Sequence, residues 1–476
     1  MQGNSLTTYI EGVYAPVSDE RTDPQLTVIG EIPSDICGAY VQNNPNPHFK
    51  PQGLYHWFDG DGMIHGVQIR EGQATYQNRY IQTNGLLAEK QANKILWKGI
   101  LEPFPTTGSQ SPDKDTANTD LIFHNGKLLA TWWLSGQPYG IDPITFQTLG
   151  PENFSNTLQL SVAAHPKVDP RTGELIFFSY NPYEKPYLQS GIISPQGKCS
   201  HTATLDCDLP SLFHDIAITE NYTIFLDLPM NWDPQKLTEG KRRVRFHPNK
   251  PARFGIMPRY DNGSNCKWFS LPACYIYHTI NAHEEKDEHG NTVVVMYCCR
   301  IENPLPTTDH TNELTIPRLF FLRLHPFLYE FRFNLGTGEA KQKQVDDYPT
   351  EFPRINDNYL GVKNQWSYHP RIAKEPSLLF DGFIKYQTKT GKSQHVVYGQ
   401  SRIGGETVFV PRENAKQEDD GYLMSFVIDR AKSRSELVIY HAQTLDRLAQ
   451  VLIPRRIPFG FHASWAPQQQ KLAEAK

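Results

Sequence analysis

Four histidines in this chain have neighbours and spacings that could bind one metal ion together. The chain has 17 histidines, so the residue type alone carries little weight. Gaps of 49, 64 and 184 residues separate the four, whereas local zinc motifs place their ligands about two to five residues apart. Their settings are Ala-Ala-His165-Pro, Leu-Phe-His214-Asp, Tyr-His278-Thr-Ile-Asn and Gly-Phe-His462-Ala-Ser-Trp.

Four imidazoles without a thiolate or a carboxylate would form a neutral ligand set. Such a set suits a borderline divalent ion such as Fe(II), and it leaves positions open if the ion prefers six ligands. Because the four histidines are far apart in sequence, we expect each to come from a different element of the fold. Those elements must bring the four side chains to one point.

Many short segments between turn signals predict strands, whereas helical periodicity is scarce and is best in Leu86–Trp97. The clearest strand-like segments are Glu174–Tyr180, Tyr222–Leu226, Thr292–Cys298 and Ser435–Tyr440. No Ser/Gly-rich or charged linker divides the chain, so we expect a single domain over residues 1–476. Many short strands in one unbroken chain are typical of an all-β propeller, and seven blades would take about 68 residues each.

Composition excludes several classes of protein. A net charge of −4 gives no electrostatic reason to bind nucleic acid. Seven cysteines, an odd number without a signal peptide, predict reduced thiols and a cytoplasmic protein. No apolar run reaches the roughly 18 residues of a membrane-spanning helix. The apolar segment Leu319–Tyr329 could line a hydrophobic passage or touch a membrane surface transiently, although a buried strand and turn is the favoured reading.

A series of short motifs in a fixed order covers nearly the whole chain and resembles the carotenoid cleavage oxygenase family, which includes lignostilbene dioxygenases. The resemblance implies a seven-bladed β-propeller with a helical and loop cap over an iron site on its axis. It also implies that the four histidines bind one Fe(II) per chain. The motifs are Gly38–Pro45, Phe58–Met63, Thr116–Thr119, Ser161–Pro166, Phe213–Asp215, His278–Glu284, Glu351–Arg354, Glu406–Arg412, Glu418–Tyr422, Ser435–Leu437 and His462–Trp465.

In this family, glutamates orient three of the four histidines, and Glu351 and Glu406 match two of these glutamates. The third is missing. It would follow Leu-Leu-Ala-Thr, where this chain reads Trp132 and Trp133, and no acidic residue lies between positions 120 and 142. We therefore expect one histidine to be oriented by water or by a backbone carbonyl, or to be held less firmly.

Candidate pocket residues also follow from the resemblance. Thr119 would crowd an open position at the iron, although Asn118 and Thr119 could instead simply cap a turn. Phe58, Trp132 and Trp133 are candidates for the substrate wall, with core packing as the alternative use of such large aromatics.

The substrate class follows from what lies near these residues. The short polar stretch before Thr116 resembles that of stilbene-cleaving relatives, which grip a phenol with a Tyr and a Lys. This chain has no Tyr in 81–138 and no Lys in 128–166, and offers Ile100, Trp132 and Trp133 instead. Apolar walls favour a polyene through buried area.

The resemblance therefore implies a non-haem Fe(II) dioxygenase that uses O2 to cleave a conjugated C=C bond of a carotenoid or apocarotenoid, giving two carbonyl products. The partners would be a hydrophobic polyene and O2. One alternative is a stilbene-cleaving dioxygenase that gives aromatic aldehydes. Another is a non-catalytic propeller that only binds a ligand, which iron content would distinguish.

Overall fold

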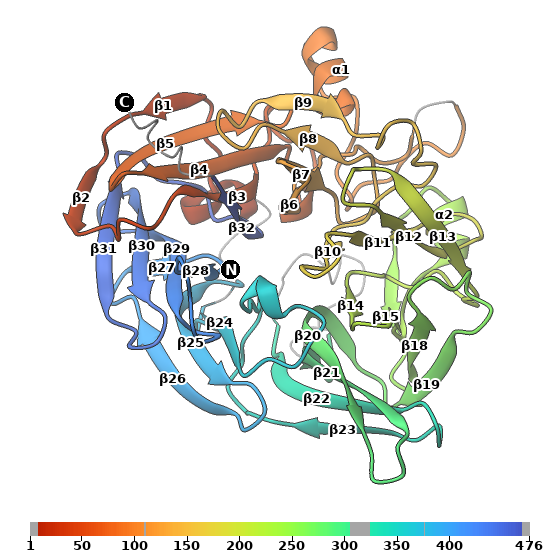
Figure 1. Cartoon of the computed structure of the whole chain (residues 1–476). Coiled ribbons are helices and arrows are strands. Elements are labelled where there is room, and N and C mark those ends of the chain that lie inside the picture. Colours follow the sequence, from red (N-terminus) through yellow and green to blue (C-terminus); the bar gives the residue numbers. More distant parts are fainter. Residues whose placement is uncertain (1–7, 109–110, 305–323, 376, 469–476) are drawn as a thin grey trace.

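A computed structural model of the chain describes residues 8–108, 111–304, 324–375 and 377–468. Antiparallel sheets radiate from a common centre (Figure 1). In the described residues the α-helices are two short ones, α1 (Asn84–Ala92) and α2 (Pro234–Thr238), with 3-10 turns η1 (Thr8–Ile10), η2 (Gly12–Tyr14), η3 (Trp57–Asp59) and η5 (Asp357–Tyr359). The all-β prediction is confirmed.

Five blades are separate sheets, and within each of them neighbouring strands pair in the following order. The first blade contains β1 (Arg21–Asp23), β5 (Gln73–Tyr80), β4 (Gly62–Arg70), β3 (Gly38–Pro45) and β32 (Ala463–Pro467). The second contains β6 (Asp120–His124), β7 (Lys127–Thr131), β8 (Tyr139–Ile141) and β9 (Thr148–Pro151), and the third contains β10 (Lys167–Val168), β11 (Leu175–Tyr180), β12 (Leu188–Ile193) and β13 (Cys199–Leu205). The fourth contains β14 (Ile216–Ile218), β15 (Tyr222–Asp227), β18 (Ala252–Pro258) and β19 (Lys267–Leu271), and the fifth contains β20 (Tyr275–Lys286), β21 (Thr292–Ile301), β22 (Phe327–Asn334) and β23 (Ala340–Gln344).

Two further blades share one nine-stranded sheet, because β27 (Arg402–Gly404) pairs with a strand of each. One blade contains β24 (Trp366–Ile372), β25 (Phe380–Gln387) and β26 (Lys392–Val397). The other contains β28 (Val408–Pro411), β29 (Gly421–Asp429), β30 (Arg434–His441), β31 (Arg447–Ile453) and β2 (Thr27–Gly30). The hairpin β16 (Met230–Trp232) and β17 (Val244–Phe246) stands apart. The count of seven blades agrees with the sequence prediction.

The last strand of the chain closes the ring against the first blade. β32 pairs with β3, with Trp465 opposite Tyr40 and Ser464 opposite Val41. Pairing the two ends of the chain in one blade removes the free edge that an open ring would leave. The hydrophobic core lies between neighbouring blades: Val41 and Leu121, for example, come from adjacent blades and share one buried cluster.

The innermost strands of the blades are β32, β6, β10, β14, β20, β24 and β28, and they surround the centre in Figure 1. β32 contacts both β6 and β28, β10 contacts β14, and β14 contacts β20. The first residues of these strands therefore lie around one axis. This arrangement satisfies the requirement, set by the sequence, that distant segments meet at one point.

The cap expected over the axis is mostly loop, and helices contribute little to it. Helix α1 overlaps the predicted Leu86–Trp97 but begins at Asn84, because the Thr83 hydroxyl accepts the Leu86 N–H at 3.1 Å. It ends at Ala92, since Asn93 adopts the left-handed conformation with φ 50°. No helix in the described ranges is long and apolar enough to span a bilayer.

The four predicted strand segments correspond to β11, β15, β21 and β30. Of the apolar segment Leu319–Tyr329, positions 319–323 lie outside the described residues. Leu324 is buried and Phe327–Tyr329 begin β22. The described end of this segment is thus a partly buried strand start, as favoured.

Candidate metal centre

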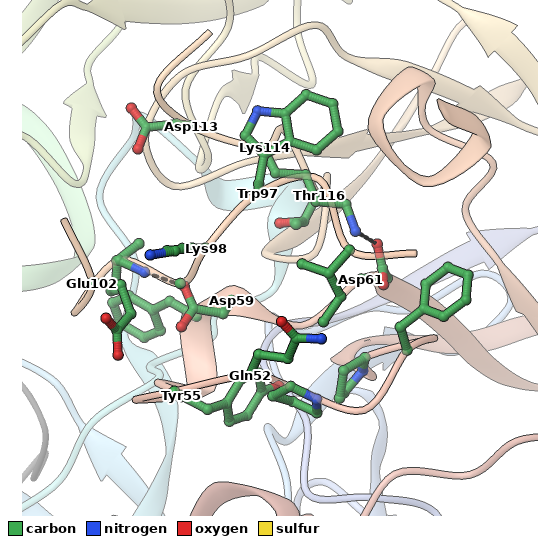
Figure 2. Close-up of a pocket in the computed structure, with 18 of the residues that line it drawn as sticks. Gln52, Tyr55, Asp59, Asp61, Trp97, Lys98, Glu102, Asp113, Lys114 and Thr116 are labelled. Atoms are coloured by element: carbon green, nitrogen blue, oxygen red, sulfur yellow. Dashed lines mark hydrogen bonds and ion pairs between the residues drawn. The ribbon is translucent and has the colours of Figure 1, made fainter. Parts of the chain in front are cut away.

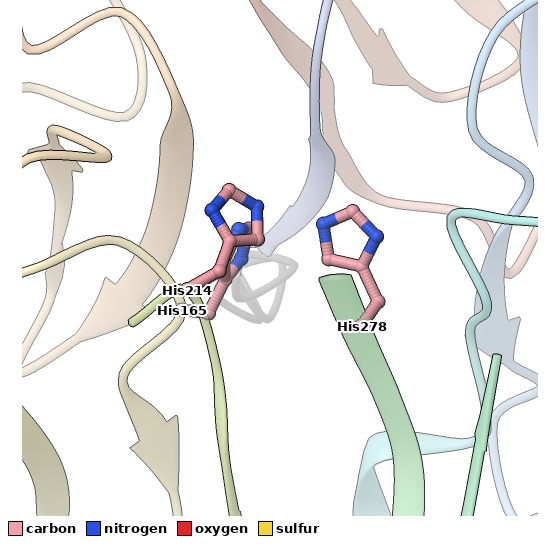
Figure 3. A group of neighbouring side chains, drawn as sticks. All are labelled: His165, His214 and His278. Atoms are coloured by element: carbon pink, nitrogen blue, oxygen red, sulfur yellow. The ribbon is translucent and has the colours of Figure 1, made fainter. Parts of the chain in front are cut away.

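The four predicted histidines lie at the start of four different inner strands. His165 and His214 each precede an inner strand by two residues, at β10 and β14. His278 lies near the start of β20, and His462 directly precedes β32. Figure 3 shows His165, His214 and His278 gathered around one point. Since every inner strand begins close to the axis, this placement brings together residues that are up to 297 positions apart (462 − 165).

The distances are those of a metal-binding cluster. One ring nitrogen each of His165, His214 and His278 lies within 4.8 Å of the other two. The ring of His462 is 4.4 Å from that of His165 and 4.7 Å from that of His278, centroid to centroid. All four side chains are buried, with 4–9% of their surface exposed.

Burial determines the charge of these rings. It lowers the pKa of His165, His214 and His278 well below the ordinary value, and that of His462 to about 4. The imidazoles are therefore neutral at pH 7. Each offers one nitrogen lone pair, which is the form that binds a metal.

Carboxylates hold three of the four rings. Glu351 Oε2 is 2.5 Å from Nδ1 of His278, and Glu406 Oε1 is 3.1 Å from Nδ1 of His462. A neutral ring that donates its Nδ1–H to a carboxylate keeps its lone pair on Nε2. The Nε2 atoms of His165 and His278 are buried and have no hydrogen-bond partner. These two buried nitrogen lone pairs, which have no hydrogen-bond donor near them, are suited to bind a cation.

The third carboxylate is Asp120, whose Oδ2 lies 2.9 Å from Nδ1 of His165. A carboxylate therefore holds His165; that one histidine is oriented by water or a backbone carbonyl, or is held less firmly, stays a prediction and applies to His214. Asp120 is the first residue of β6 and pairs across the hairpin with Thr131, the residue just before the position where the family's glutamate was sought. The carboxylate of Asp120 thus lies on β6, the strand paired with the one that precedes Trp132. The sequence around Trp132 alone could not reveal this neighbour. Among the described residues, no carboxylate hydrogen-bonds to His214.

The backbone is also held around the centre. Glu406 Oε2 accepts the Ala463 N–H at 2.6 Å, which fixes the segment next to His462. His165 has φ +64° and Phe352 has φ +54°, a conformation that costs an L-residue about 1–2 kcal/mol. Strain of this kind persists where surrounding contacts over-determine the backbone, and it is common at functional sites.

The buried carboxyl groups add to the case for a cation. Burial raises the pKa of Asp120, drives that of Glu351 well above its usual range, and raises that of Glu406 to about 7. A divalent ion beside the histidines would favour the charged form of each acid. The residues present thus fit a divalent metal ion bound by neutral nitrogens.

An apolar cavity of about 30 Å³ reaches the histidines, with room for about one water molecule. Three of the four predicted pocket residues line it: Phe58, Thr119 and Trp133. The others in its wall are Trp57, His214, Tyr277, His278, Leu324, Phe352, Leu378, Phe461 and His462. Sequence reasoning missed Tyr277, Phe352 and Phe461, although each directly follows or precedes a motif residue.

Thr119 both lines the cavity beside the histidines and takes part in local backbone hydrogen bonds, the two roles that the sequence left open. It lines the cavity with His214 and His278. Its hydroxyl also accepts the Trp133 N–H at 3.0 Å and donates to Asn118 Oδ1 at 3.0 Å. The same side chain therefore narrows the cavity and fixes the backbone of Trp133.

Trp132 lines a different pocket, of about 320 Å³, which shares Phe58 with the apolar cavity. Figure 2 shows this pocket. Ile100 lines it too, but charged residues do so as well, among them Asp59 and Lys114. The apolar wall expected from Ile100, Trp132 and Trp133 is therefore divided between two cavities. Trp133 lines the apolar cavity, whereas Ile100 and Trp132 share this pocket with charged side chains such as Asp59, the last residue of η3. The Asp59 carboxyl accepts two backbone N–H groups, and burial raises its pKa to about 6.

Comparisons with known proteins agree with this geometry. The family described as retinal pigment epithelial membrane protein (RPE65) matches residues 14–467. Carotenoid 9,10(9',10')-cleavage dioxygenase 1 of Arabidopsis thaliana is 39% identical, over 97% of this chain and 90% of the relative.

Two solved structures are similar over nearly their whole length. Lignostilbene dioxygenase of Pseudomonas brassicacearum has a TM-score of 0.85 at 29% identity, covering 97% of this chain and 98% of the other. Apocarotenoid oxygenase of Synechocystis, as a tryptophan-to-alanine mutant, has a TM-score of 0.83 at 26% identity, covering 98% and 99%. A cobalt-substituted form of the Synechocystis enzyme matches as well.

Proposed function

The chain belongs to the RPE65 family of carotenoid cleavage oxygenases, and on that premise we propose that it is an Fe(II) dioxygenase that cleaves a conjugated C=C bond of a carotenoid or apocarotenoid. In this proposal the metal ligands are His165, His214, His278 and His462, which bind one ion per chain. The observation that carries it is the gathering of neutral imidazoles, three of them held by carboxylates, at the wall of an apolar cavity.

The carboxylates act through the histidines. Asp120, Glu351 and Glu406 hold the Nδ1–H of three rings, so that each Nε2 lone pair points to one centre. Four neutral nitrogen donors would leave the full charge of a divalent ion at the centre. Fe(II), when bound, supplies the activation of dioxygen.

The reaction needs no acid, base or external reductant. A C=C bond and O2 together contain the atoms and electrons of two C=O groups, so the double bond breaks and each carbon takes one oxygen. The chain supplies positioning: Phe58, Trp133 and Phe352 line the apolar space beside the histidines and exclude water from it. The bond that stops beside the centre is the bond that is cleaved.

The apolar lining favours a polyene over a stilbene. The cavity beside the histidines has almost no polar surface, so a phenolic hydroxyl would lose its hydrogen bonds to water on entering. The plant relative at 39% identity is named for carotenoid cleavage at the 9,10 bond, whereas the lignostilbene dioxygenase is 29% identical. We propose the 9,10 bond of a carotenoid as the first to test.

The experiment is product analysis under labelled oxygen. The iron-loaded protein is incubated with 18O2 and, in parallel, with a C40 carotenoid, an apocarotenal and a hydroxystilbene, and the products are identified by mass. We expect paired carbonyl products from the polyenes, with label in both. Aromatic aldehydes from the stilbene alone would select the alternative substrate, and unaltered polyenes and stilbene would refute the enzyme assignment.

We further propose that residues 1–476 form one domain working in the cytoplasm. The pairing of β32 with β3 supports the first statement, because the two ends of the chain complete one blade. Seven free cysteines support the second, since thiols persist in a reducing compartment. Cell fractionation with a redox-state assay of the thiols tests the location.

A further inference from the structure

The histidines are reached from two directions by cavities of opposite character. The apolar cavity is lined by residues that precede the inner strands, such as Thr119 and Phe461, or lie near the start of one, such as Tyr277 in β20. A second cavity, of about 370 Å³, is lined by residues further along the same strands, including Ile122 and Val168. Because it follows the inner strands, this axial cavity approaches the histidines from the other side.

The axial cavity is open to solvent at one end and ends on the metal centre at the other. Asp357 and Asn358 at its outer end are exposed. Its inner end is formed by the buried rings of His165, His278 and His462. Its volume equals that of about twelve water molecules, at roughly 30 Å³ each in the liquid. This volume exceeds that of the six water molecules around a hexahydrated ion.

Charged and polar side chains make up much of the lining of the axial cavity, so an ion that passes through it keeps contact with polar atoms. Four carboxyl groups line it, and two cations oppose them. One cation is Lys167, which is neutralised by Asp215 at 2.7 Å, and the other is Arg354, 3.3 Å from Asp357. The carboxyl groups belong to Asp120, Asp215, Asp357 and Glu406.

The apolar cavity cannot serve a hydrated ion. It holds about one water molecule and is walled mainly by aromatic and aliphatic side chains. An ion that passed through it would lose its hydration shell without gaining new ligands, and burying an unpaired charge in this way is strongly unfavourable. A polyene has the opposite preference, since it buries more apolar area per contact in the apolar cavity than in the axial cavity, where charged and apolar side chains are mixed.

We propose that the metal ion reaches its site through the axial cavity, and that the apolar side is reserved for the organic substrate. This inference rests on the metal centre of the proposed function and goes beyond it by assigning a role to Asn358 and its neighbours at the outer end of the axial cavity. The route would let the protein acquire or exchange its ion without opening the aromatic wall.

The route is tested by changing the charge by one unit at the outer end of the axial cavity and, separately, at the pocket beside Phe58. Asn358→Asp adds one negative charge at the outer end of the axial cavity, and Asn358→Lys adds one positive charge there. Lys98→Gln makes the same change as Asn358→Asp at the pocket beside Phe58, where Lys98 is exposed. The chain is stripped of metal with a chelator, and uptake of Co²⁺ is followed by stopped-flow quenching of tryptophan fluorescence.

A divalent ion that passes about 7 Å from the new charge is attracted or repelled enough to change the rate about fivefold at 0.01 M salt and about twofold at 0.15 M. We expect Asn358→Asp to speed uptake and Asn358→Lys to slow it by these factors, with the difference shrinking as salt is added. Lys98→Gln should leave the rate unchanged.

The outcomes separate this inference from the proposed function. If Lys98→Gln speeds uptake while both Asn358 variants match the wild type, the ion does not pass Asn358 and the route is wrong. Equal rates in all four proteins overturn it as well. If the wild-type chain binds no Co²⁺ at equilibrium, the metal centre itself is refuted, whatever the rates.

Discussion

The carboxylate of Asp120 offers a sharp test, because its role was not visible in the sequence. Its two oxygens both accept: Oδ2 from His165 Nδ1 at 2.9 Å, and Oδ1 from the Leu121 N–H at 2.8 Å. In Asp120→Asn the amide has only one acceptor oxygen, so one of the two buried donors must face an NH2 group. An unsatisfied buried donor costs about 1–3 kcal/mol.

That free energy predicts the change in metal affinity. At about 1.4 kcal/mol per tenfold change, losses of this size correspond to a metal affinity weaker by about 10–100-fold. The Kd for Co²⁺ is measured by competition with a chelator of known affinity, for the wild type, Asp120→Asn and Glu351→Gln. Glu351 holds His278 in the same way, so we expect its variant to lose affinity by a similar factor.

Asp206→Asn is the matched control, since Asp206 is exposed and directly follows β13, the strand of its blade that lies furthest from the inner strand β10. It should bind Co²⁺ as the wild type does. Wild-type affinity in Asp120→Asn, together with a loss in Glu351→Gln, would show that Asp120 does not orient His165. Melting curves of the metal-free proteins distinguish weak binding from misfolding.

Three further predictions follow from other parts of the molecule. His278→Ala should purify with almost no iron by elemental analysis, because it removes a central ligand; an iron-replete, active variant would contradict the ligand set. Removing the metal should lower the melting temperature by about 3 °C when the ion had been present at 100 times its Kd, since binding then contributes about 2.7 kcal/mol, and an unchanged value would mean that no site had been filled. Hydrogen bonds from Arg332, Lys363 and His283 lower the pKa of Glu285 to about 2, so its ionised form stabilises the folded protein above the unfolded pKa near 4.5, and this stabilisation is lost as the pH falls towards 2. Glu285→Gln should therefore lower the free energy of unfolding, measured by urea denaturation, by about 1 kcal/mol at pH 7 and by progressively less below pH 4.5. A difference between the two proteins that does not change with pH would refute this.

The sequence predicted the parts of the fold that depend on local pattern. Short apolar runs such as Tyr222–Leu226 became strands, because alternation and turn residues determine strand positions directly. The helix around Leu86 was displaced by a few residues, since its ends depend on the Thr83 cap and on the backbone of Asn93. The pairing of β32 with β3 joins distant segments, and no local pattern in the sequence predicted it.

The residues of the site can likewise be separated into those that a local sequence pattern predicted and those that only the folded structure reveals. The structure brings together His165, His214, His278 and His462, which the sequence singled out through their motifs. It reveals Asp120 as well, because a carboxylate that lies across a hairpin has no signature along one strand. The charged lining around Asp59 was likewise hidden, since residues from separate loops share one pocket.

The most direct test of the account is a crystal structure of the iron-loaded protein with anomalous data collected on both sides of the iron absorption edge. The account predicts one anomalous peak per chain, about 2.1 Å from Nε2 of His165, His214, His278 and His462. A peak elsewhere, or a fully loaded protein in which any of these four rings does not touch the iron, would contradict it.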